Sequence, residues 1–363
     1  MKIKRIKINT KSPYEVVVGD GILESELRYT LELLDGKKFC IISDFGVPNN
    51  IVEKVKSALY HNKNEVFCYS FPCGEESKSL TTLFEILSFL ADCNLSRKDT
   101  VVAVGGGVVG DVAGLASSLY MRGIKYVQVP TTLLSAIDSS VGGKTAVNLP
   151  KGKNLVGSFY QPTRVICDVS TFSSLEKREV LCGLAEGVKC ALIEGEKFFS
   201  TLEDLVYVDD ENTIKHAKNG SFEGFDFTSF VGECVRIKGE IVSIDEFENG
   251  ERKILNFGHS VGHAIEKLYG YKISHGECVA KGICKVLDAF AVEYKNLELA
   301  QKVKNLFVRL GVDISCPFTS NEIVNAMAND KKANNGSISL IVMPSLGNPK
   351  ILDIELENLR EIL

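Results

Sequence analysis

The chain lacks the features of three large classes of protein. It has no basic excess, since 42 lysine and arginine residues face 47 aspartate and glutamate residues, and binding to a nucleic-acid backbone needs such an excess. Its longest apolar run, 101–120, is interrupted by Asp111 and five glycines, which excludes a membrane span. Its first residues, MKIKRIKINTK, alternate like an edge strand and contain no apolar segment of a secretory signal. We therefore expect neither nucleic-acid nor membrane partners.

A disulfide framework is also missing. The 11 cysteines are odd in number, and no CxxC motif occurs. Most lie within apolar runs such as FCII and GICKV, where a reduced cysteine acts as a small hydrophobic side chain. We expect reduced thiols and a cytoplasmic location.

Length and hydrophobic pattern predict two domains. The 363 residues exceed the roughly 250 to 300 at which a single core stops growing. Short apolar runs alternate with helical patterns in the first part of the chain, which predicts an α/β domain, 1–173, with a parallel sheet. The expected strands are 39–43, 65–71, 101–104, 126–130 and 164–168, and a helix is expected at 77–92.

Longer helical patterns fill the remainder, which predicts a mostly α-helical second domain, 174–363. Its one expected strand is 337–343, and residues 215–230 have too little pattern for a role. The expected helices are 175–194, 226–246, 258–268, 276–294 and 297–310.

A glycine-rich turn follows the expected strand at 101–104. Gly105, Gly107 and Gly110 match G-x-G-x-x-G, and the helical pattern VAGLASSLY comes next. This is the strand, turn and helix context that dinucleotide binding needs. Glycines let the backbone approach a pyrophosphate, whose charge is stabilised by the free N–H groups of the helix start.

Two features differ from an ordinary Rossmann domain, in which the turn follows the first strand and an acid for the ribose lies about 20 residues on. Here the turn follows a late strand, and no acid lies at that distance. Asp44, at the end of the strand FCIISD, is a candidate for the ribose hydroxyls. A helix cap or a turn role for Asp44 is the alternative.

The segment GGKT at 142–145 is not a Walker motif, because position 138, where the first glycine would fall, is Asp138. We expect Asp138, Lys144, Lys153 and Asn154 on a glycine-punctuated loop. Two lysines and an amide there suit a phosphate or carboxylate, and solvated surface lysines are the alternative.

Three of the five histidines fall within a short stretch. His259 and His263 share one face of an expected helix, and their spacing makes them the first candidates for two metal ligands. The glutamate of H-E-x-x-H is missing, and histidines on the helix surface or in a cap are the alternative. His275, in SHGE, could supply a further imidazole.

A carboxylate ligand is expected from Glu186, which interrupts the apolar helical pattern GLAEGVKCALI. A buried carboxylate is costly unless it is paired or bound to a metal. Lys189, one turn later, shares its face, so a salt bridge between the two is the alternative.

Taken together, these segments resemble the 3-dehydroquinate synthase family, and the resemblance covers nearly the whole chain. It implies a dinucleotide-binding α/β domain followed by a helical domain, with the active site between them. The shared motifs, in the family's order across 105–332, are GGGVVGD, MRG, QVPTTLLSAIDSSVGGKTAVN, GKNLVGSFYQP, GLAEGVK, an arginine before LNFGHSVGHAIE, HGE and DKK.

The resemblance also implies the cofactors. One divalent metal, usually zinc with cobalt as the alternative, would be held by Glu186, His259 and His275. This set replaces the pair suggested by spacing, so that His263 becomes a group beside the substrate. NAD would bind Asp44, Glu75, Lys78, Gly106, Gly107, Val108, Asp111, Thr131 and Thr132, together with Asp138, Lys144 and Lys153.

The implied substrate is a sugar phosphate. Arg122 would reach the phosphate of the substrate in the neighbouring subunit, which implies a homodimer. The substrate pocket would be lined by Asp138, Lys144, Lys153, Asn154, Lys189, Lys238, Arg252, Asn256, His263 and one or both of Lys331 and Lys332.

The implied reaction converts 3-deoxy-D-arabino-heptulosonate 7-phosphate to 3-dehydroquinate and phosphate in the shikimate pathway. Its steps are transient oxidation by NAD, phosphate elimination, re-reduction, ring opening and intramolecular aldol closure. The rivals are another sugar phosphate cyclase, such as 2-deoxy-scyllo-inosose synthase, a metal- and NAD-dependent polyol dehydrogenase, and a non-catalytic NAD-binding protein. The retained Lys238, Arg252 and Asn256 favour the dehydroquinate reaction.

Two positions differ from the family. Asp44-Phe45-Gly46 lacks the usual asparagine after the strand-end aspartate, which affects contacts on the adenosine side of NAD. AEGVK stands in place of AEVIK and puts a glycine beside Glu186 without removing the carboxylate.

Overall fold

The computed structural model describes residues 2–60, 64–205, 225–330 and 336–363. The chain forms two compact units. The first comprises Met1–Leu175 and Phe227–Phe247, and the second comprises Glu176–Asp226 and Glu248–Leu363. The predicted division at 173 and 174 differs from this grouping mainly in the segment 227–247, which was expected in the second domain.

The first unit is built on a seven-stranded sheet in the order β1-β2-β9-β6-β5-β3-β4. The edge strand β1 is antiparallel to β2, and the remaining neighbours are parallel. The expected strands are confirmed within a residue at each end. The strands are β1 (Ile3–Ile8), β2 (Tyr14–Gly19), β3 (Lys38–Asp44), β4 (Glu65–Phe71), β5 (Thr100–Gly105), β6 (Lys125–Pro130) and β9 (Arg164–Asp168).

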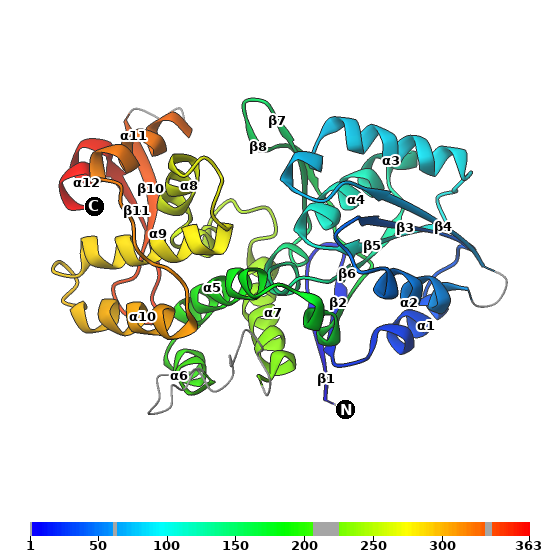
Figure 1. Cartoon of the computed structure of the whole chain (residues 1–363), viewed down its shortest axis with the longest axis horizontal. Helices are drawn as coiled ribbons and strands as arrows, with labels where there is room; N and C mark the ends of the chain where they lie inside the picture. Colours follow the sequence, from blue (N-terminus) through cyan, green and yellow to red (C-terminus); the bar gives the residue numbers. More distant parts are fainter. Residues whose placement is uncertain (1, 61–63, 206–224, 331–335) are drawn as a thin grey trace. The chain divides into compact units, whose positions relative to one another are not determined.

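Helices cover both faces of this sheet (Figure 1). Side chains alternate along β3, so Phe39 and Ile41 pack with α1 (Leu23–Glu32) and α2 (Asn49–Leu59) on one face. Cys40 and Ile42 pack with α3 (Leu80–Asp92) and α4 (Gly107–Leu119) on the other. The chain thus leaves the neighbouring strands β3 and β5 toward opposite faces. The carboxyl ends of strands at such a switch point are the usual place for a ligand in an open α/β sheet.

A β-hairpin replaces the loop that was expected for Lys144, Lys153 and Asn154. Its strands are β7 (Lys144–Leu149) and β8 (Gly152–Phe159), which pair antiparallel. Thr145 and Val147 are buried while Lys144 is exposed, and this period-2 alternation is typical of a strand. The lysines and glycines had obscured that pattern. Asp138 lies before the hairpin in a π-helical turn, η3 (Ser135–Ser139).

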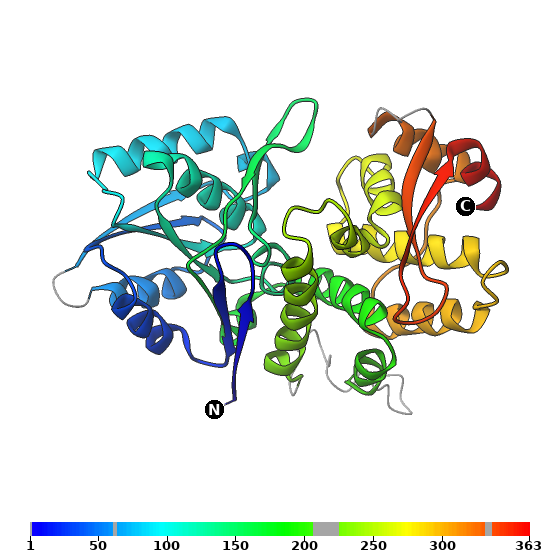
Figure 2. The ribbon, with the colours of Figure 1, turned by 180° about the vertical axis from the view of Figure 1, so that it is seen from behind.

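Helix α7 (Phe227–Ile244) belongs to the first unit, where it lies along β1 and β2 (Figure 2). Two glycines make the contact close. A Cβ on Gly239 would lie 2.4 Å from Ile8, and one on Gly232 would lie 2.3 Å from the Lys4 side chain. The helical pattern was therefore predicted correctly, but the sheet against which it packs was not.

The second unit is mostly helical and contains one antiparallel strand pair, β10 (Ser337–Val342) and β11 (Lys350–Glu355). β11 was not expected, and the helix expected to reach 294 ends at Phe290. The helices are α5 (Lys177–Glu194), α6 (Glu196–Leu205), α8 (His259–Leu268), α9 (His275–Phe290), α10 (Leu297–Leu310), α11 (Ser320–Asp330) and α12 (Leu356–Ile362). Among the described residues, no helix combines the length and apolar character needed to cross a membrane.

Glycines allow three helices of this unit to approach closely. A Cβ on Gly282 of α9 would lie 2.1 Å from the carbonyl oxygen of Gly258, which precedes α8. A Cβ on Gly276, in the first turn of α9, would lie 2.2 Å from the carbonyl oxygen of Cys182 on α5. These approaches fix the start of α9 against both α5 and α8.

Candidate functional site

The glycine turn of the first unit joins β5 to α4. Thr131 N donates to Gly105 O at 3.0 Å, which continues the pairing of β6 with β5 up to the turn, and Gly106 caps the helix. A Cβ on Gly106 would lie 3.3 Å from the Thr132 side chain, and one on Gly107 would lie 3.1 Å from Ser139 Oγ. The turn therefore offers bare backbone and the first N–H groups of a helix, which suit a pyrophosphate.

Asp44 ends β3, the strand beside β5. Its Oδ1 accepts a hydrogen bond from Gly46 N at 2.9 Å, and burial raises the pKa of this carboxyl. The turn role that was the alternative for Asp44 is therefore present. Its position at the carboxyl end of β3 leaves the ribose role as a prediction.

An ion pair between Lys78 and Asp111 lies beside the glycine turn. Lys78 is buried and follows a short turn that begins at Glu75, and Asp111 lies in α4. Burial raises the pKa of Asp111 to about 6, although Lys78 opposes the shift. Asn148 Nδ2 donates to Glu75 Oε1 at 2.7 Å and links this turn to the hairpin.

The remaining candidates of the first unit differ in their burial. Lys238 on α7 is 6% exposed, and its Nζ donates to both Asp138 Oδ1 and Asp138 O at 2.7 Å. Lys144 and Lys153 are exposed on the hairpin, and Arg122 is exposed after α4. Arg122 has a φ of 64°, a left-handed conformation that is costly for a non-glycine residue.

The second unit brings Glu186, His259 and His275 together from α5, α8 and α9. Glu186 is 1% exposed. His259 Nε2 lies 3.3 Å and His275 Nε2 lies 3.4 Å from Glu186 Oε1. Two ligand atoms about 2.0–2.1 Å from a tetrahedral zinc ion lie about 3.3–3.4 Å apart. The spacing therefore fits one ion bound by all three side chains.

The protonation of His259 supports the same conclusion. Its Nδ1 lies 3.2 Å from the carbonyl oxygen of Phe257, which can only accept, so the proton is on Nδ1. Burial lowers the pKa of His259, which favours the neutral ring. Its Nε2 lone pair then faces Glu186 Oε1, and neither oxygen of Glu186 has a well-aligned hydrogen bond from the described residues. A cation between the two acceptors would remove this mismatch.

His275 has a carboxylate behind it. Its Nδ1 lies 3.5 Å from Oε2 of the buried Glu266, the arrangement that orients metal-binding imidazoles. Burial opposes the charged ring, but contacts with Glu186 and Glu266 outweigh it and raise the pKa of His275 to about 9. Without a metal, the imidazolium supplies the positive charge that Glu186 attracts.

The expected alternative of a salt bridge is also realised. Lys189 Nζ lies 2.6 Å from Glu186 Oε2, and the Lys189 side chain is 2% exposed. Burial alone would raise the pKa of Glu186, but the ammonium group of Lys189 holds it well below its usual value. Lys189 pairs with Oε2 of Glu186, and the two imidazoles face Oε1. The same carboxylate can therefore form the salt bridge and bind a metal.

His263 lies next to this cluster. Its ring centroid is 5.4 Å from that of His259 and 5.6 Å from that of His275. Together with Glu266 and His275 it forms a second group with ligand spacing among the described residues. Its side chain is exposed and lines a pocket, which agrees with a place beside a substrate.

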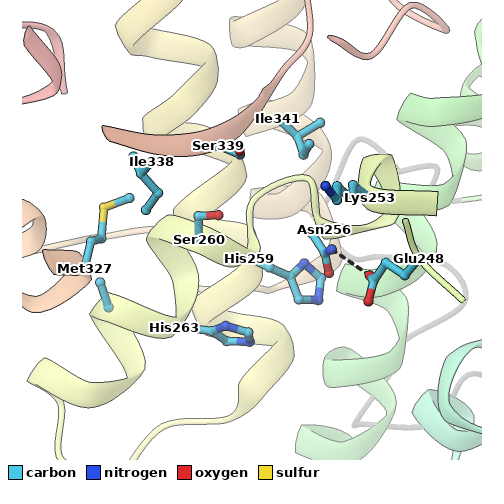
Figure 3. Close-up of a pocket in the computed structure, with 11 residues that line it drawn as sticks. Glu248, Lys253, Asn256, His259, Ser260, His263, Met327, Ile338, Ser339 and Ile341 are labelled. Carbon is cyan, nitrogen blue, oxygen red and sulfur yellow. Dashed lines mark hydrogen bonds between the residues drawn. The ribbon is translucent and has the colours of Figure 1, made fainter. Parts of the chain in front are cut away.

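The pocket has a volume of about 380 Å³ and lies in the second unit (Figure 3). Asn256 Nδ2 donates to Glu248 Oε1 at 2.9 Å on its wall, while the expected Arg252 is almost fully buried. Lys331 and Lys332 lie outside the described residues. The lining residues are Glu248, Lys253, Asn256, His259, Ser260, His263, Ala264, Met327, Ile338, Ser339 and Ile341.

Several of these residues were not expected from the sequence. Lys253 adds a half-buried cation to the wall, and Ser260 and Ser339 add hydroxyl groups. Ser260 follows His259, so its place beside the candidate ligand could have been found from the motif. Ser339 lies on β10 and has no such local signal.

Fold and site together define a class: an α/β unit with a dinucleotide-type glycine turn, and a helical unit with a carboxylate and two imidazoles at one point. Models described as 3-dehydroquinate synthase N-terminal and 3-dehydroquinate synthase C-terminal match residues 68–182 and 183–333. The chain belongs to the 3-dehydroquinate synthase family.

Individual relatives agree with this assignment. The 3-dehydroquinate synthase of Streptococcus thermophilus is 37% identical over 365 residues and that of Streptococcus gordonii 38% over 356, covering 99% and 97% of both chains. A crystal structure of 2-deoxy-scyllo-inosose synthase complexed with carbaglucose-6-phosphate, NAD+ and Co2+ has a TM-score of 0.83 at 27% identity. It covers 99% of this chain and 100% of that one.

Proposed function

We propose that this chain converts 3-deoxy-D-arabino-heptulosonate 7-phosphate to 3-dehydroquinate and phosphate, with NAD and one divalent metal as cofactors. Family membership supports the reaction, and the convergence of Glu186, His259 and His275 carries the proposal for the metal. A carboxylate with two imidazoles is a ligand set of catalytic zinc sites, which leave one position open for a substrate. Zinc is the proposed ion, with cobalt as the alternative.

The first unit would bind NAD. Bare backbone at Gly106 and Gly107 faces the pyrophosphate, Asp44 binds the ribose, and Thr131 and Thr132 border the turn on the β6 side. The ion pair with Asp111 would hold the ammonium group of Lys78 beside the phosphates of NAD. When bound, the two cofactors supply a reversible oxidant for one secondary alcohol and a Lewis acid that lowers the pKa of that alcohol.

The second unit would bind the metal and the polar part of the substrate. Lys189 neutralises Glu186, so that this buried carboxylate stays ionised before any metal binds. Asn256 is held by Glu248 at the pocket wall and can hydrogen-bond a substrate hydroxyl. His263, exposed at the same wall, is placed to move a proton to or from such a group.

The charged residues would recognise the ends of the substrate. Lys144, Lys153 and Asn154 suit the phosphate, since ammonium and amide donors stabilise its charge as it leaves. Lys238 and Arg252 suit the carboxylate, and Lys331 or Lys332 would assist the departure of the phosphate. A polyol has neither a phosphate nor a carboxylate for these cations to recognise, which favours the cyclase reaction over a polyol dehydrogenase.

A single assay separates the rival reactions. Purified protein is incubated with the heptulosonate phosphate, NAD and zinc, while phosphate, dehydroquinate and NADH absorbance are followed together. We expect equal amounts of phosphate and dehydroquinate with no net NADH. NADH rising in step with product would instead indicate a dehydrogenase, and turnover of glucose 6-phosphate alone would indicate the inosose-type cyclase.

We further propose a cytoplasmic homodimer in which Arg122 reaches the partner's substrate. The strained backbone and exposed side chain of Arg122 support a role outside its own fold. Sedimentation should give twice the mass of one chain. A functional dimer should also regain activity when an Arg122→Ala subunit is mixed with a Glu186→Gln subunit, because one of the two sites then has both residues.

A further inference from the structure

The hairpin β7–β8 carries three residues of the proposed substrate site and projects away from the seven-stranded sheet (Figures 1 and 2). An isolated two-stranded hairpin is marginally stable in water, so its far end must be fixed by another part of the unit. Lys144 lies at the sheet end of the hairpin, whereas Lys153 and Asn154 lie near its turn. The positions of Lys153 and Asn154 therefore depend on what anchors that turn.

Asn148 provides the anchor through three of its polar groups. Its backbone N donates to Lys78 O at 2.8 Å, and its Nδ2 donates to Glu75 Oε1 at 2.7 Å. Its Oδ1 accepts from the backbone N of Asn154 at 2.8 Å. One residue thus connects the turn at 75–78 to the opposite strand of the hairpin.

An interruption of the hairpin ladder explains how Asn148 can do this. The hairpin register shifts between Val147 and Leu149, which places Asn148 at the irregular position. Between these two pairs β7 has only Asn148, whereas β8 has residues 153–155, so the extra residues are on β8 and the ladder is interrupted opposite Asn148. The N–H of Asn148 is consequently available for Lys78 O instead of a partner on β8.

The connection continues from this turn to the glycine turn. Lys78 pairs through its side chain with Asp111 in α4, the helix that begins at Gly107. Glu75 and Lys78 therefore contact the hairpin on one side, while Lys78 also contacts the start of α4. A movement of the 75–78 turn would be transmitted to both.

We propose that Asn148 is a positioning residue that couples dinucleotide binding to the placement of Lys153 and Asn154 for the substrate's phosphate. This inference rests on the proposed function only in assigning Glu75 and Lys78 to NAD and the hairpin residues to an anion. Coupling is reciprocal, so the anion must tighten NAD binding as much as NAD tightens anion binding.

Calorimetry can measure the coupling without turnover, with NAD titrated into the full-length, zinc-loaded chain in the absence and presence of saturating inorganic phosphate. We expect phosphate to tighten NAD binding at least about fivefold in the unmodified protein. Asn148→Ala should reduce this factor to about twofold or less, because the contacts of Oδ1 and Nδ2 are lost. Asn305→Ala, at an exposed position on α10, is the matched control and should keep the full factor.

A charge exchange distinguishes coupling from simple loss of structure. In Asn148→Asp the new carboxylate can still accept from Asn154 N but repels Glu75, so the coupling should be lost. Adding Glu75→Gln returns a donor to the same contact and should restore the coupling. Glu75→Gln alone should retain it, since the Gln oxygen still accepts from Asn148 Nδ2.

The inference is overturned if phosphate leaves NAD affinity unchanged in the unmodified protein, if Asn148→Ala keeps the full factor, or if the double variant behaves like Asn148→Asp. The dehydroquinate assay reports separately on the proposed reaction. Loss of turnover with normal coupling would count against the reaction alone, and normal turnover with no coupling against the role of Asn148 alone.

Discussion

The two candidate binding sites of this chain are built from different parts of the polypeptide. The glycine turn offers mostly main chain: N–H groups at a helix start and positions where a Cβ would intrude. The cluster around Glu186 is made of side chains that come from three helices. The first site depends on the absence of side chains at a few glycine positions, and the second depends on how the helices pack.

This difference predicts how each site can be damaged. A main-chain site loses its ligand when a side chain is added, because the approach of the backbone is blocked. A side-chain site loses its ligand when a donor atom is removed or when the helices move apart. Each kind of change should therefore affect one binding activity and spare the other.

The largest effect is expected from Glu186→Gln. The change removes the charge that both imidazoles face but keeps an oxygen for Lys189, so the fold should survive with reduced stability. Loss of a Lewis acid costs several kcal/mol of transition-state stabilisation, and we expect turnover to fall by at least about a thousandfold. Zinc content by elemental analysis and the dehydroquinate assay measure the two consequences.

The controls for this variant test the asymmetry between the sites. Glu194→Gln, at an exposed position of the same helix, should retain zinc and activity. NAD affinity should change little in Glu186→Gln, since no main-chain group of the first unit is altered. Full activity of Glu186→Gln in a chelated, zinc-free preparation would contradict the metal assignment.

A pair of glycine variants gives the next largest effect and tests both sites at once. In Gly276→Ala the Cβ would lie 2.2 Å from the carbonyl oxygen of Cys182, so α9 must shift and carry His275 away from Glu186. Zinc affinity should fall by about a hundredfold or more, with a loss of about 1–3 kcal/mol in unfolding free energy. Gly107→Ala should weaken NAD instead and leave zinc binding intact. If both variants lost the same ligand, the contrast between the two sites would be wrong.

Local signals were sufficient to predict most strands of the sheet and the glycine turn, although β2 was not expected. The strands β3, β4, β5, β6 and β9 are short apolar runs flanked by turns, and each was expected near its observed position. The hairpin β7–β8 was expected to be a loop because glycines and lysines interrupt its apolar positions. Helix α7 was found as a helix, but nothing in its own pattern shows that it packs on β1 and β2.

The metal cluster shows where local spacing stops being informative. Spacing favours His259 and His263, which are neighbours on one helix, but in the structure Glu186 of α5 faces His259 and His275 instead. That convergence depends on close approaches at Gly276 and Gly282, and helix contacts of this kind have no signature in a single segment. All three residues were candidates from the sequence, but only the family resemblance set His263 aside before the structure.

The pH dependence of stability provides a test within the first site. The pKa of Asp111 is raised to about 6 from an ordinary value near 3.8, so between these pH values the folded protein holds a proton that the unfolded chain has lost. The contribution of this group to stability therefore falls as pH rises through that window and is constant above it. Relative to Asp111→Asn, the unfolding free energy should drop by up to about 3 kcal/mol between pH 4 and 7. Chemical denaturation at several pH values measures this difference. An unfolding free energy that rises between pH 4 and 7 would contradict the raised pKa of Asp111.

The smallest effect is expected from Glu266→Gln, behind the second site. Glu266 Oε2 lies 3.5 Å from His275 Nδ1, and a carboxylate there orients the ring and makes Nε2 a better donor to a metal. Glutamine keeps an acceptor of the same length without the charge, so zinc affinity should fall by about tenfold, the lower end for such partners. Competition with a chelator measures this zinc affinity, and Glu298→Gln, at an exposed position of α10, is the control. NAD affinity should not change in either variant, because the first unit holds its ligand through main chain that neither substitution touches.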